Sequence, residues 1–342
     1  MALKRVTMQD IADACGLSRN TVSKVFNGRG LVPESTQKMV LAKAQELGYH
    51  QLPSGSNRNA REAQGSIALL TQHKLLNHGF GSVFMTSFTD QLSRAGFSLK
   101  IFEISPQELA ARQLPLRLNL DDTIGFLGIE LFDKQYLDLI CSLNKPTVFV
   151  DAHAHACRDL LSCDVISMEN VGNEHLLVTR MIKAGAKRIG FVGDIEHCNS
   201  FYERWVGYFL ALRDAGLELD QSLCILADDS EDYGNTDWIL QQLANMPSLP
   251  DAFACANDFL AIHLMTALKR LGLSIPSDIM VCGFDGSIEA GLYDPPLSTA
   301  LIPGEDIGRL AATVLTARIQ DPGRPYFWTY VKSTPIHGNT IR

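Results

Sequence analysis

The spacing of apolar residues changes twice along this chain of 342 residues. In residues 1–50 apolar positions recur at helical spacing, and in residues 51–65 that periodicity gives way to Gly, Ser, Asn and Pro. Beyond this stretch, short apolar runs alternate with amphipathic segments. The pattern predicts a helical N-terminal domain (1–50), a hinge or linker (51–65) and an α/β core (66–342).

The N-terminal domain is expected to consist of three short helices. Thr7 and Asp10 have the spacing of a capping box, Gly16 breaks the first helix, and Ser18 can cap the second. A third helix follows, and its core face is predicted to carry Val40, Ala44 and Leu47.

The second of these helices separates apolar from polar side chains. Val22, Val25 and Phe26 fall on one face. The other face carries hydrogen-bond donors and no acid, namely Arg19, Asn20, Ser23, Lys24 and Asn27. Arg and Lys suit guanine edges, Asn suits adenine, and small polar groups suit phosphates. The pattern therefore predicts a DNA-binding helix-turn-helix rather than an ordinary pair of surface helices.

The core is predicted to form two α/β lobes built on parallel, doubly wound sheets. Its buried strands are expected in SIALLT, SLKIFEI, TIGFLGI, PTVFV, DVIS, RIGFVG, SLCIL, DAFAC and IMVCGF. Amphipathic helices are expected near 80–95, 133–143, 169–185, 200–215, 235–246, 257–271 and 304–320. Near-continuous apolar strands that alternate with helices are typical of parallel sheets covered on both faces. Ligands of such sheets bind beyond the carboxyl ends of the strands, which places a cleft between the lobes.

Charge is distributed unevenly along the chain. Residues 1–65 contain nine Lys/Arg and five Asp/Glu, a net charge of +4, whereas the whole chain carries −8 and the remainder therefore −12. A small basic domain on an acidic body favours local, salt-dependent contact with DNA.

Several classes of protein are disfavoured by the sequence. No signal peptide precedes the first helix, and no apolar run reaches the ~20 residues that span a bilayer. The eight cysteines form no CxxC pair, which favours free thiols in a reducing cytoplasm. The chain has no GxxxxGK[ST] loop, no GxSxG elbow and no HExxH helix. We therefore expect a cytoplasmic, non-enzymatic protein without a cofactor or a resident metal.

The stretch VTMQDIADACGLSRNTVSKVFNGRGLVPESTQKMVLAKAQELGY resembles the headpiece of the lactose-repressor (LacI/GalR) family of bacterial transcription regulators. The resemblance covers all three expected helices. It implies that Arg19, Asn20 and Lys24 contact base edges. It also implies that phosphates are held by Thr7, Ser18, Ser23, Asn27 and Thr36.

The linker departs from the pattern of this family. The family carries a short hinge helix that forms on operator DNA and inserts a leucine into the minor groove. Here Leu52 is the only bulky apolar residue of the linker, although Arg58 and Arg61 could meet phosphates if NRNAREA became helical. Whether this hinge kinks DNA stays open.

The core also resembles the regulatory core of this family, which is similar to periplasmic sugar-binding proteins. The resemblance rests on GAKRIGFVGD, SFYERWVGYFLALRDAGL, CANDFLAIHLMTALKRLGLSIPSDIMVCGFD and the PPLST run. It implies three chain crossings between the lobes. The expected N-lobe is about 66–164 and 302–332, and the expected C-lobe is about 165–301 and 333–342.

Seven residues are candidates for effector binding through this resemblance. They are Phe80 and Asp151 in the N-lobe and Ser200, Arg204, Asn257, Asp258 and Asp285 in the C-lobe. Asp, Asn and Arg can bind the hydroxyls of a polyol, and an aromatic ring can cover its apolar face. Some of these residues could instead be helix caps, because Ser200 and Asp258 begin helices.

One acidic segment distinguishes the expected C-lobe. The family often has an aromatic residue after the strand that corresponds to SLCIL, but here that neighbourhood is LADDSEDYG, with Asp228, Asp229, Glu231 and Asp232 ahead of Tyr233. An acidic cleft would favour an amine-bearing or cationic effector over a neutral sugar.

The run DAHAHAC places Asp151, His153, His155 and Cys157 at alternating positions. This set could hold Zn²⁺, but no fourth ligand is marked elsewhere in the chain. A solvent-exposed loop and effector contact through His153 are the alternatives.

The sequence therefore predicts a homodimeric, sequence-specific repressor that binds a pseudo-palindromic operator in double-stranded DNA. Its affinity would be controlled by a sugar or sugar derivative bound between the lobes. No apolar heptads follow the core, so a tetramerising coiled coil is not expected. The alternative is a cytoplasmic sugar-binding protein with a degenerate headpiece.

Overall fold

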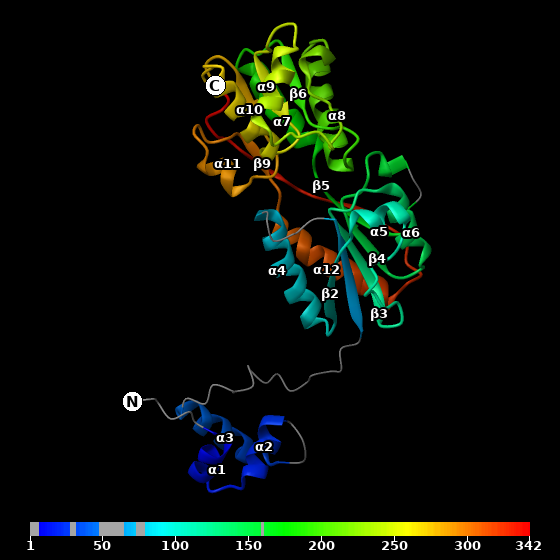
Figure 1. Cartoon of the computed structure of the whole chain (residues 1–342), viewed down its shortest axis with the longest axis vertical. Helices are drawn as coiled ribbons and strands as arrows, with labels where there is room; N and C mark the ends of the chain where they lie inside the picture. The colour runs from blue at the N-terminus through cyan, green and yellow to red at the C-terminus, as the bar shows by residue number, and fades with distance from the viewer. Residues whose placement is uncertain (1–6, 28–31, 48–64, 73–78, 159–160) are drawn as a thin grey trace. The chain divides into compact units, whose positions relative to one another are not determined.

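The computed structural model divides into two compact units, Met1–Arg61 and Glu62–Arg342 (Figure 1). The residues that it describes are 7–27, 32–47, 65–72, 79–158 and 161–342. Leu52, Arg58 and Arg61 lie outside this part of the chain, and so do the side chains of Phe26, Asn27 and Cys157.

The N-terminal unit contains three helices around a small apolar core. They are α1 (Met8–Cys15), α2 (Arg19–Asn27) and α3 (Glu34–Glu46). Fully buried side chains from all three meet at its centre, namely Ile11, Ala12, Val22, Val25, Val40 and Ala44. Leu47, expected on the core face, is 37% exposed because α3 ends one residue before it.

The ends of the first two helices follow the sequence signals. The Thr7 side chain accepts a hydrogen bond from the Asp10 backbone N–H, and the Asp10 carboxylate accepts one from the Thr7 N–H at 2.7 Å. Gly16 ends α1 with φ 66°, a conformation that costs glycine little. The Thr21 N–H donates to Ser18 Oγ at 3.1 Å, which satisfies one donor at the start of α2.

The N-lobe of the second unit is built on a six-stranded parallel sheet of order β10-β5-β4-β3-β1-β2. Its strands are β1 (Ser66–Thr71), β2 (Ser98–Glu103), β3 (Thr123–Ile129), β4 (Thr147–Val150), β5 (Asp164–Met168) and β10 (Trp328–Val331). Its helices are α4 (Gly79–Arg94), α5 (Pro106–Ala111), α6 (Lys134–Ser142) and α12 (Gly304–Gln320).

Alternating side chains of β1 reach opposite faces of this sheet. Ile67 and Leu69 join an apolar cluster with the facing side chains of α4 and α12, whereas Ala68 and Leu70 join a second cluster with those of α6. The near-continuous apolar strand thus reflects burial on both faces, as predicted.

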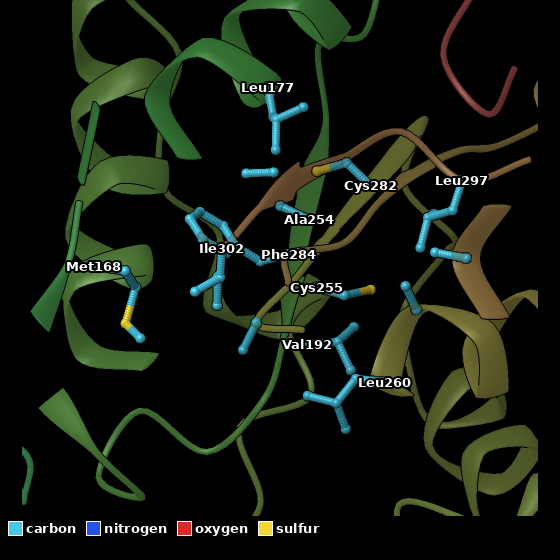
Figure 2. Packing of buried hydrophobic residues seen from close by; sticks show 14 of the residues in the cluster. Met168, Leu177, Val192, Ala254, Cys255, Leu260, Cys282, Phe284, Leu297 and Ile302 are labelled. Carbon is cyan, nitrogen blue, oxygen red and sulfur yellow. The ribbon is translucent and has the colours of Figure 1, made fainter. Parts of the chain in front are cut away.

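The C-lobe is built on a three-stranded parallel sheet of order β6-β7-β8. Its strands are β6 (Ile189–Val192), β7 (Ala252–Cys255) and β8 (Met280–Cys282). Its helices are α7 (Val171–Lys183), α8 (Asn199–Asp214), α9 (Thr236–Ala244), α10 (Asp258–Arg270) and α11 (Ile288–Leu292). Figure 2 shows side chains from β7, β8 and α10 in the core of this lobe.

Three chain segments connect the two lobes. They run from β5 to α7, from β9 (Thr299–Leu301) to α12, and from β10 to β11 (Thr334–Ile336). β9 and β11 pair antiparallel beside the crossings. The lobe boundary expected at residue 164/165 falls within β5, all of whose residues belong to a strand of the N-lobe sheet. The first crossing therefore follows Met168.

Most of the predicted strands and helices are present, with a few differences. SLCIL is not a strand, because Gln221–Leu223 forms a 3₁₀ turn and Ile225 makes an isolated bridge with Val192. The short elements α5, α11, β9, β10 and β11 were not predicted, since segments of three to six residues show too little periodicity. Among the described residues, no helix is both long and apolar enough to span a membrane.

Candidate functional site

The outer face of α2 presents the residues expected to contact bases. Arg19, Asn20 and Lys24 are exposed, whereas Val22 and Val25 on the opposite face are buried against α1 and α3. Packing of the apolar face thus orients the donors outward, in the arrangement that a recognition helix needs.

The residues expected at phosphates have mixed environments. Thr7 and Ser18 are exposed at helix N-termini, and Ser23 and Thr36 are half-buried. Thr7 Oγ1 donates to the Asp10 carboxylate at 2.6 Å, and Ser18 Oγ lies 2.8 Å from Thr21 Oγ1. These two hydroxyls therefore have capping partners as well as access to solvent. The side chain of Asn27 is outside the described part of the chain.

In the second unit, three acidic residues with positive φ follow core strands. Glu130 (φ 49°) follows β3, Asp151 (φ 61°) follows β4, and Asp285 (φ 120°) follows β8. Non-glycine residues in such conformations are strained and concentrate at functional sites. The carboxyl ends of parallel strands are also where ligands of this architecture bind. The sequence did not predict Glu130 as a site residue, although it directly follows the run TIGFLGI.

Arg204 on α8 connects several of the candidate residues. Its side chain is 2% exposed. Nε donates to Asn170 Oδ1 at 3.1 Å, and Nη1 donates to the carbonyl of Ala256 and to Asp285 Oδ1, the latter at 3.2 Å. The guanidinium also lies over the buried Phe284 ring, 3.9 Å from its centroid. Arg204 is therefore held in one orientation beside a strained carboxylate.

Two carboxyl groups near Arg204 have raised pKa values. Burial raises the pKa of Asp258 to about 6, against the hydrogen bonds from Thr299 Oγ1 (2.6 Å) and the Ser287 N–H (2.7 Å). Partial withdrawal from water raises the pKa of Asp285, and the Arg204 charge opposes that shift. Asp285 keeps 32% of its side chain exposed, so it stays accessible to a ligand, whereas Asp258 is committed to internal partners.

Asp151 and Ser200 meet across the lobes. One Asp151 oxygen accepts the Ala152 N–H at 2.8 Å and the other the Ser200 N–H at 3.4 Å, at the start of α8. The Ser200 hydroxyl donates to Met168 Sδ at 3.0 Å. Both residues are buried, so their observed contacts are structural.

Two other candidates have local roles. Asn257 is the N-cap of α10 and accepts the Leu260 N–H at 2.9 Å. Phe80 stacks on Phe84 with ring centroids 6.0 Å apart, and it packs against Gly304 at the start of α12. The structure therefore brings together Arg204 with Asp285 and Asp151 with Ser200, while Phe80, Asn257 and Asp258 pack or cap.

An aromatic cluster between the lobes was also missed. The His197 ring lies 5.0 Å from Phe132, which follows β3, and 5.1 Å from Phe201 on α8. His197 Nδ1 is 3.2 Å from Asp229 Oδ2, so the acidic segment after SLCIL reaches this cluster through one residue. Tyr233 is instead buried in the C-lobe, where its hydroxyl donates to the Ala227 carbonyl at 2.8 Å.

The segment DAHAHAC is not the exposed loop that was one expectation. Asp151, His153 and Ala154 are buried because the start of α8 packs on this segment, and the Asn199 N–H donates to the Ala152 carbonyl at 2.9 Å. His155 Nε2 lies 3.0 Å from Glu196 Oε1. No cluster of three His, Cys, Asp or Glu side chains suited to a metal occurs among the described residues. The cysteines of that part of the chain are free thiols.

Comparisons with known proteins match both units. Residues 7–51 match the family described as "Bacterial regulatory proteins, lacI family", and residues 178–333 match "Periplasmic binding protein-like domain". The HTH-type transcriptional repressor CytR of Escherichia coli K12 is 26% identical over 318 residues, which cover 92% of this chain and 90% of CytR. The ribose operon repressor of Haemophilus influenzae is also 26% identical, over 98% of each chain.

Solved structures share the fold. The Lac repressor dimer bound to operator and the anti-inducer ONPF has a TM-score of 0.70 at 22% identity, covering 98% of this chain and 99% of that one. The complex of the regulator CelR with cellobiose has a TM-score of 0.69 at 24% identity, covering 98% and 100%. Neither matching family model describes an enzyme. The chain therefore combines a helix-turn-helix domain of the lacI family with a periplasmic-binding-protein-like domain, and relatives that it matches over more than nine-tenths of its length are transcriptional repressors.

Proposed function

We propose that this protein is a homodimeric repressor that binds a pseudo-palindromic operator. Binding of a small molecule between the two lobes of the core would lower or raise its affinity for that operator. The headpiece would comprise residues 1–50, the hinge 51–65 and the effector-binding core 66–342. The observation that carries the proposal is the outward row of donors on a helix packed by its apolar face. Relatives of similar length that repress transcription support it.

The roles of the DNA-contacting residues are part of this proposal. Arg19, Asn20 and Lys24 would read base edges in the major groove. Backbone contacts would come from Thr7, Ser18, Ser23, Asn27 and Thr36. The test is selection of bound sequences from a random duplex pool by the purified protein at about 0.15 M salt, where phosphate contacts alone bind weakly. Recovery of an inverted repeat supports the proposal, and recovery of no motif contradicts it.

Arg19→Ala is expected to reduce the affinity for the selected operator by about 1–3 kcal/mol and to relax sequence preference at one position per half-site. The physical reason is loss of bidentate hydrogen bonding to one base. Binding titrations against operators changed at single positions measure the effect. An equal loss on every sequence would mean that Arg19 contacts phosphate only.

We propose that the effector is a sugar derivative that carries an amine. Asp285 and Glu130 are carboxylates at the carboxyl ends of strands in opposite lobes, and Arg204 offers one positive charge to this region. Arg204 already pairs with Asp285, so the carboxylate of Glu130 is left to be balanced by a cationic group of the effector. The CelR–cellobiose complex shows that a relative of this fold takes a sugar.

Glucosamine is therefore expected to bind more tightly than glucose, by roughly the 1.5–3 kcal/mol of a hydrogen bond to a charged group. Isothermal titration calorimetry of both compounds measures the difference. The Glu130→Gln variant should reduce that difference. Tight binding of glucose with no binding of glucosamine would contradict the proposed chemistry.

A further inference from the structure

A buried carboxylate lies next to Arg204 on α8. Glu203 is 9% exposed. Its Oε2 accepts a hydrogen bond from Asn170 Nδ2 at 2.7 Å, and its Oε1 accepts one from Tyr330 Oη at 2.6 Å. Asn170 in turn accepts from Arg204 Nε at 3.1 Å. Four side chains thus form one chain of hydrogen bonds, from Tyr330 through Glu203 and Asn170 to Arg204.

These side chains come from different lobes. Tyr330 lies on β10, in the N-lobe sheet, where it is paired in register with Ser167 of β5. Glu203 and Arg204 lie on α8 in the C-lobe, and Asn170 lies between β5 and α7, in the first crossing. The hydrogen bonds therefore join the two lobes directly.

Glu203 and Arg204 also contact residues beside the other two crossings. Tyr330 precedes the crossing from β10 to β11 by one residue of strand. Asp285, the ion-pair partner of Arg204, donates its N–H to the Ala300 carbonyl at 2.9 Å and accepts the Ile302 N–H at 3.1 Å, next to the crossing from β9 to α12. Glu203 and Arg204 together thus contact residues in or beside all three crossings.

The bonds to Glu203 are of the strong kind. A carboxylate acceptor makes hydrogen bonds about twice as strong as neutral ones, and a low local dielectric strengthens them further. Burial raises the pKa of Glu203, while the hydrogen bonds from Tyr330 and Asn170 act in the opposite direction. Rotation of one lobe against the other would have to break or re-form the bond between Tyr330 and Glu203, since Tyr330 belongs to the N-lobe and Glu203 to the C-lobe.

We propose that Glu203 and Tyr330 are positioning residues that hold Asn170 and Arg204 and thereby couple the effector cleft to the orientation of the N-lobe. The inference rests on the proposed regulatory function and names the contacts through which it acts. Effector binding that moves Arg204 changes the hydrogen bond between Arg204 and Asn170. The hydrogen bonds from Asn170 and Tyr330 to Glu203 then change in turn, which alters the contact of α8 with β10. Coupling of this kind is reciprocal, so operator binding must also alter the cleft.

The test uses reciprocity, because it needs no effector. Hydrogen exchange of the full-length protein is followed by mass spectrometry with and without the operator duplex recovered from the random pool. The unsubstituted protein is expected to show operator-dependent exchange in residues 199–206. Tyr330→Phe should lose most of that response while binding the duplex with an affinity within about threefold of the unsubstituted protein, because Tyr330 lies on β10 of the second unit and not on the helices expected to contact DNA.

Two further variants sharpen the result. Tyr326→Phe removes the same hydroxyl from a 51% exposed residue four positions earlier and should leave the response intact. Glu203→Gln keeps an acceptor for Tyr330 but replaces the other oxygen by a donor facing Asn170, so it should lose the response. It therefore tests the inference independently if Tyr330→Phe folds poorly. A full response in Tyr330→Phe or Glu203→Gln, or no response in the unsubstituted protein, would overturn the inference.

A second arm separates this inference from the proposed function. Without DNA, exchange of residues 168–173 should rise about tenfold in Tyr330→Phe relative to Tyr326→Phe, the change expected from loss of a hydrogen bond to a buried charged group. If the pool yields no operator, the proposed function fails, and this arm alone decides whether Glu203 and Tyr330 hold the crossing. Equal exchange in the two variants would overturn that role.

Discussion

Replacing Arg318 with methionine is expected to lower the free energy of unfolding of the core by about 3–5 kcal/mol, because it leaves a buried carboxylate without its partner. The side chains of Arg318 and Asp164 are 3% and 1% exposed. Nε and Nη2 of Arg318 donate to the two oxygens of Asp164 at 2.9 and 3.1 Å. Arg318 lies near the end of α12 and Asp164 begins β5, so the pair fixes the helix to the sheet.

The remaining donors of Arg318 hold the chain that leads into β10. They reach the carbonyls of Pro322, Arg324 and Pro325, and the guanidinium lies 4.4 Å from the centroid of the Tyr326 ring. Asp164 also accepts the Phe327 N–H at 2.9 Å. Loss of the guanidinium therefore also loosens the approach to an edge strand of the six-stranded sheet.

Urea unfolding followed by circular dichroism measures this effect. Arg309→Met is the matched control, since Arg309 lies on the same helix and its ion pairs with Glu305 and Asp306 are exposed. That variant should lose less than about 1 kcal/mol. Asp164→Leu combined with Arg318→Met should recover part of the loss, because no charge is then buried unpaired. A loss in Arg318→Met no larger than in Arg309→Met would contradict the prediction.

Glu174 is expected to make the core less stable as the pH rises from about 4.5 to about 8. Its side chain is fully buried on α7, and neither carboxyl oxygen has a hydrogen-bond partner. Burial raises its pKa from 4.5 to about 8, although the Arg204 charge acts in the opposite direction. The unfolded chain loses this proton near pH 4.5, whereas the folded protein keeps it until about pH 8. The folded state therefore binds more protons across this window, and the free energy of unfolding falls as the pH rises.

The full cost, reached above this window, is roughly 5 kcal/mol, from 1.36 kcal/mol for each unit of pKa shift. Glu174→Leu should reduce the slope and stabilise the core at pH 8, because an apolar side chain replaces a carboxyl group with no hydrogen-bond partner. Urea midpoints of the variant and the unsubstituted protein, measured from pH 5 to pH 8, give the difference. Glu218→Gln changes an exposed carboxyl and should keep the original slope. If Glu174→Leu has the same pH dependence as the unsubstituted protein, the carboxyl is not buried as described.

Local signals accounted for the headpiece. The pairing of Thr7 with Asp10, the turn at Gly16 and the division of α2 into two faces each depend on residues a few positions apart, so they can be read along the chain. The recognition face follows from the same periodicity, because the buried positions of α2 determine which side chains remain outside.

The strands of the core could also be predicted from the sequence where both of their faces are buried, as in β1, β3 and β4. The short strands β9, β10 and β11 were not, since their residues are only partly buried or few in number. The first lobe boundary was likewise expected too early, within β5, because a chain crossing has no hydrophobic periodicity that marks its position.

The sequence by itself determined the helix-turn-helix, the parallel α/β class and the donors available for DNA, because all three depend on short-range spacing of apolar and polar residues. Only the tertiary structure decided which charged groups meet. Arg318 and Asp164 are 154 residues apart in sequence, and Tyr330 and Glu203 are 127 apart. The buried state of Glu174 likewise results from the packing of α7 on β7 and β8. Contacts between distant segments depend on how elements stack, and nothing in the local spacing of a charged residue records its partner.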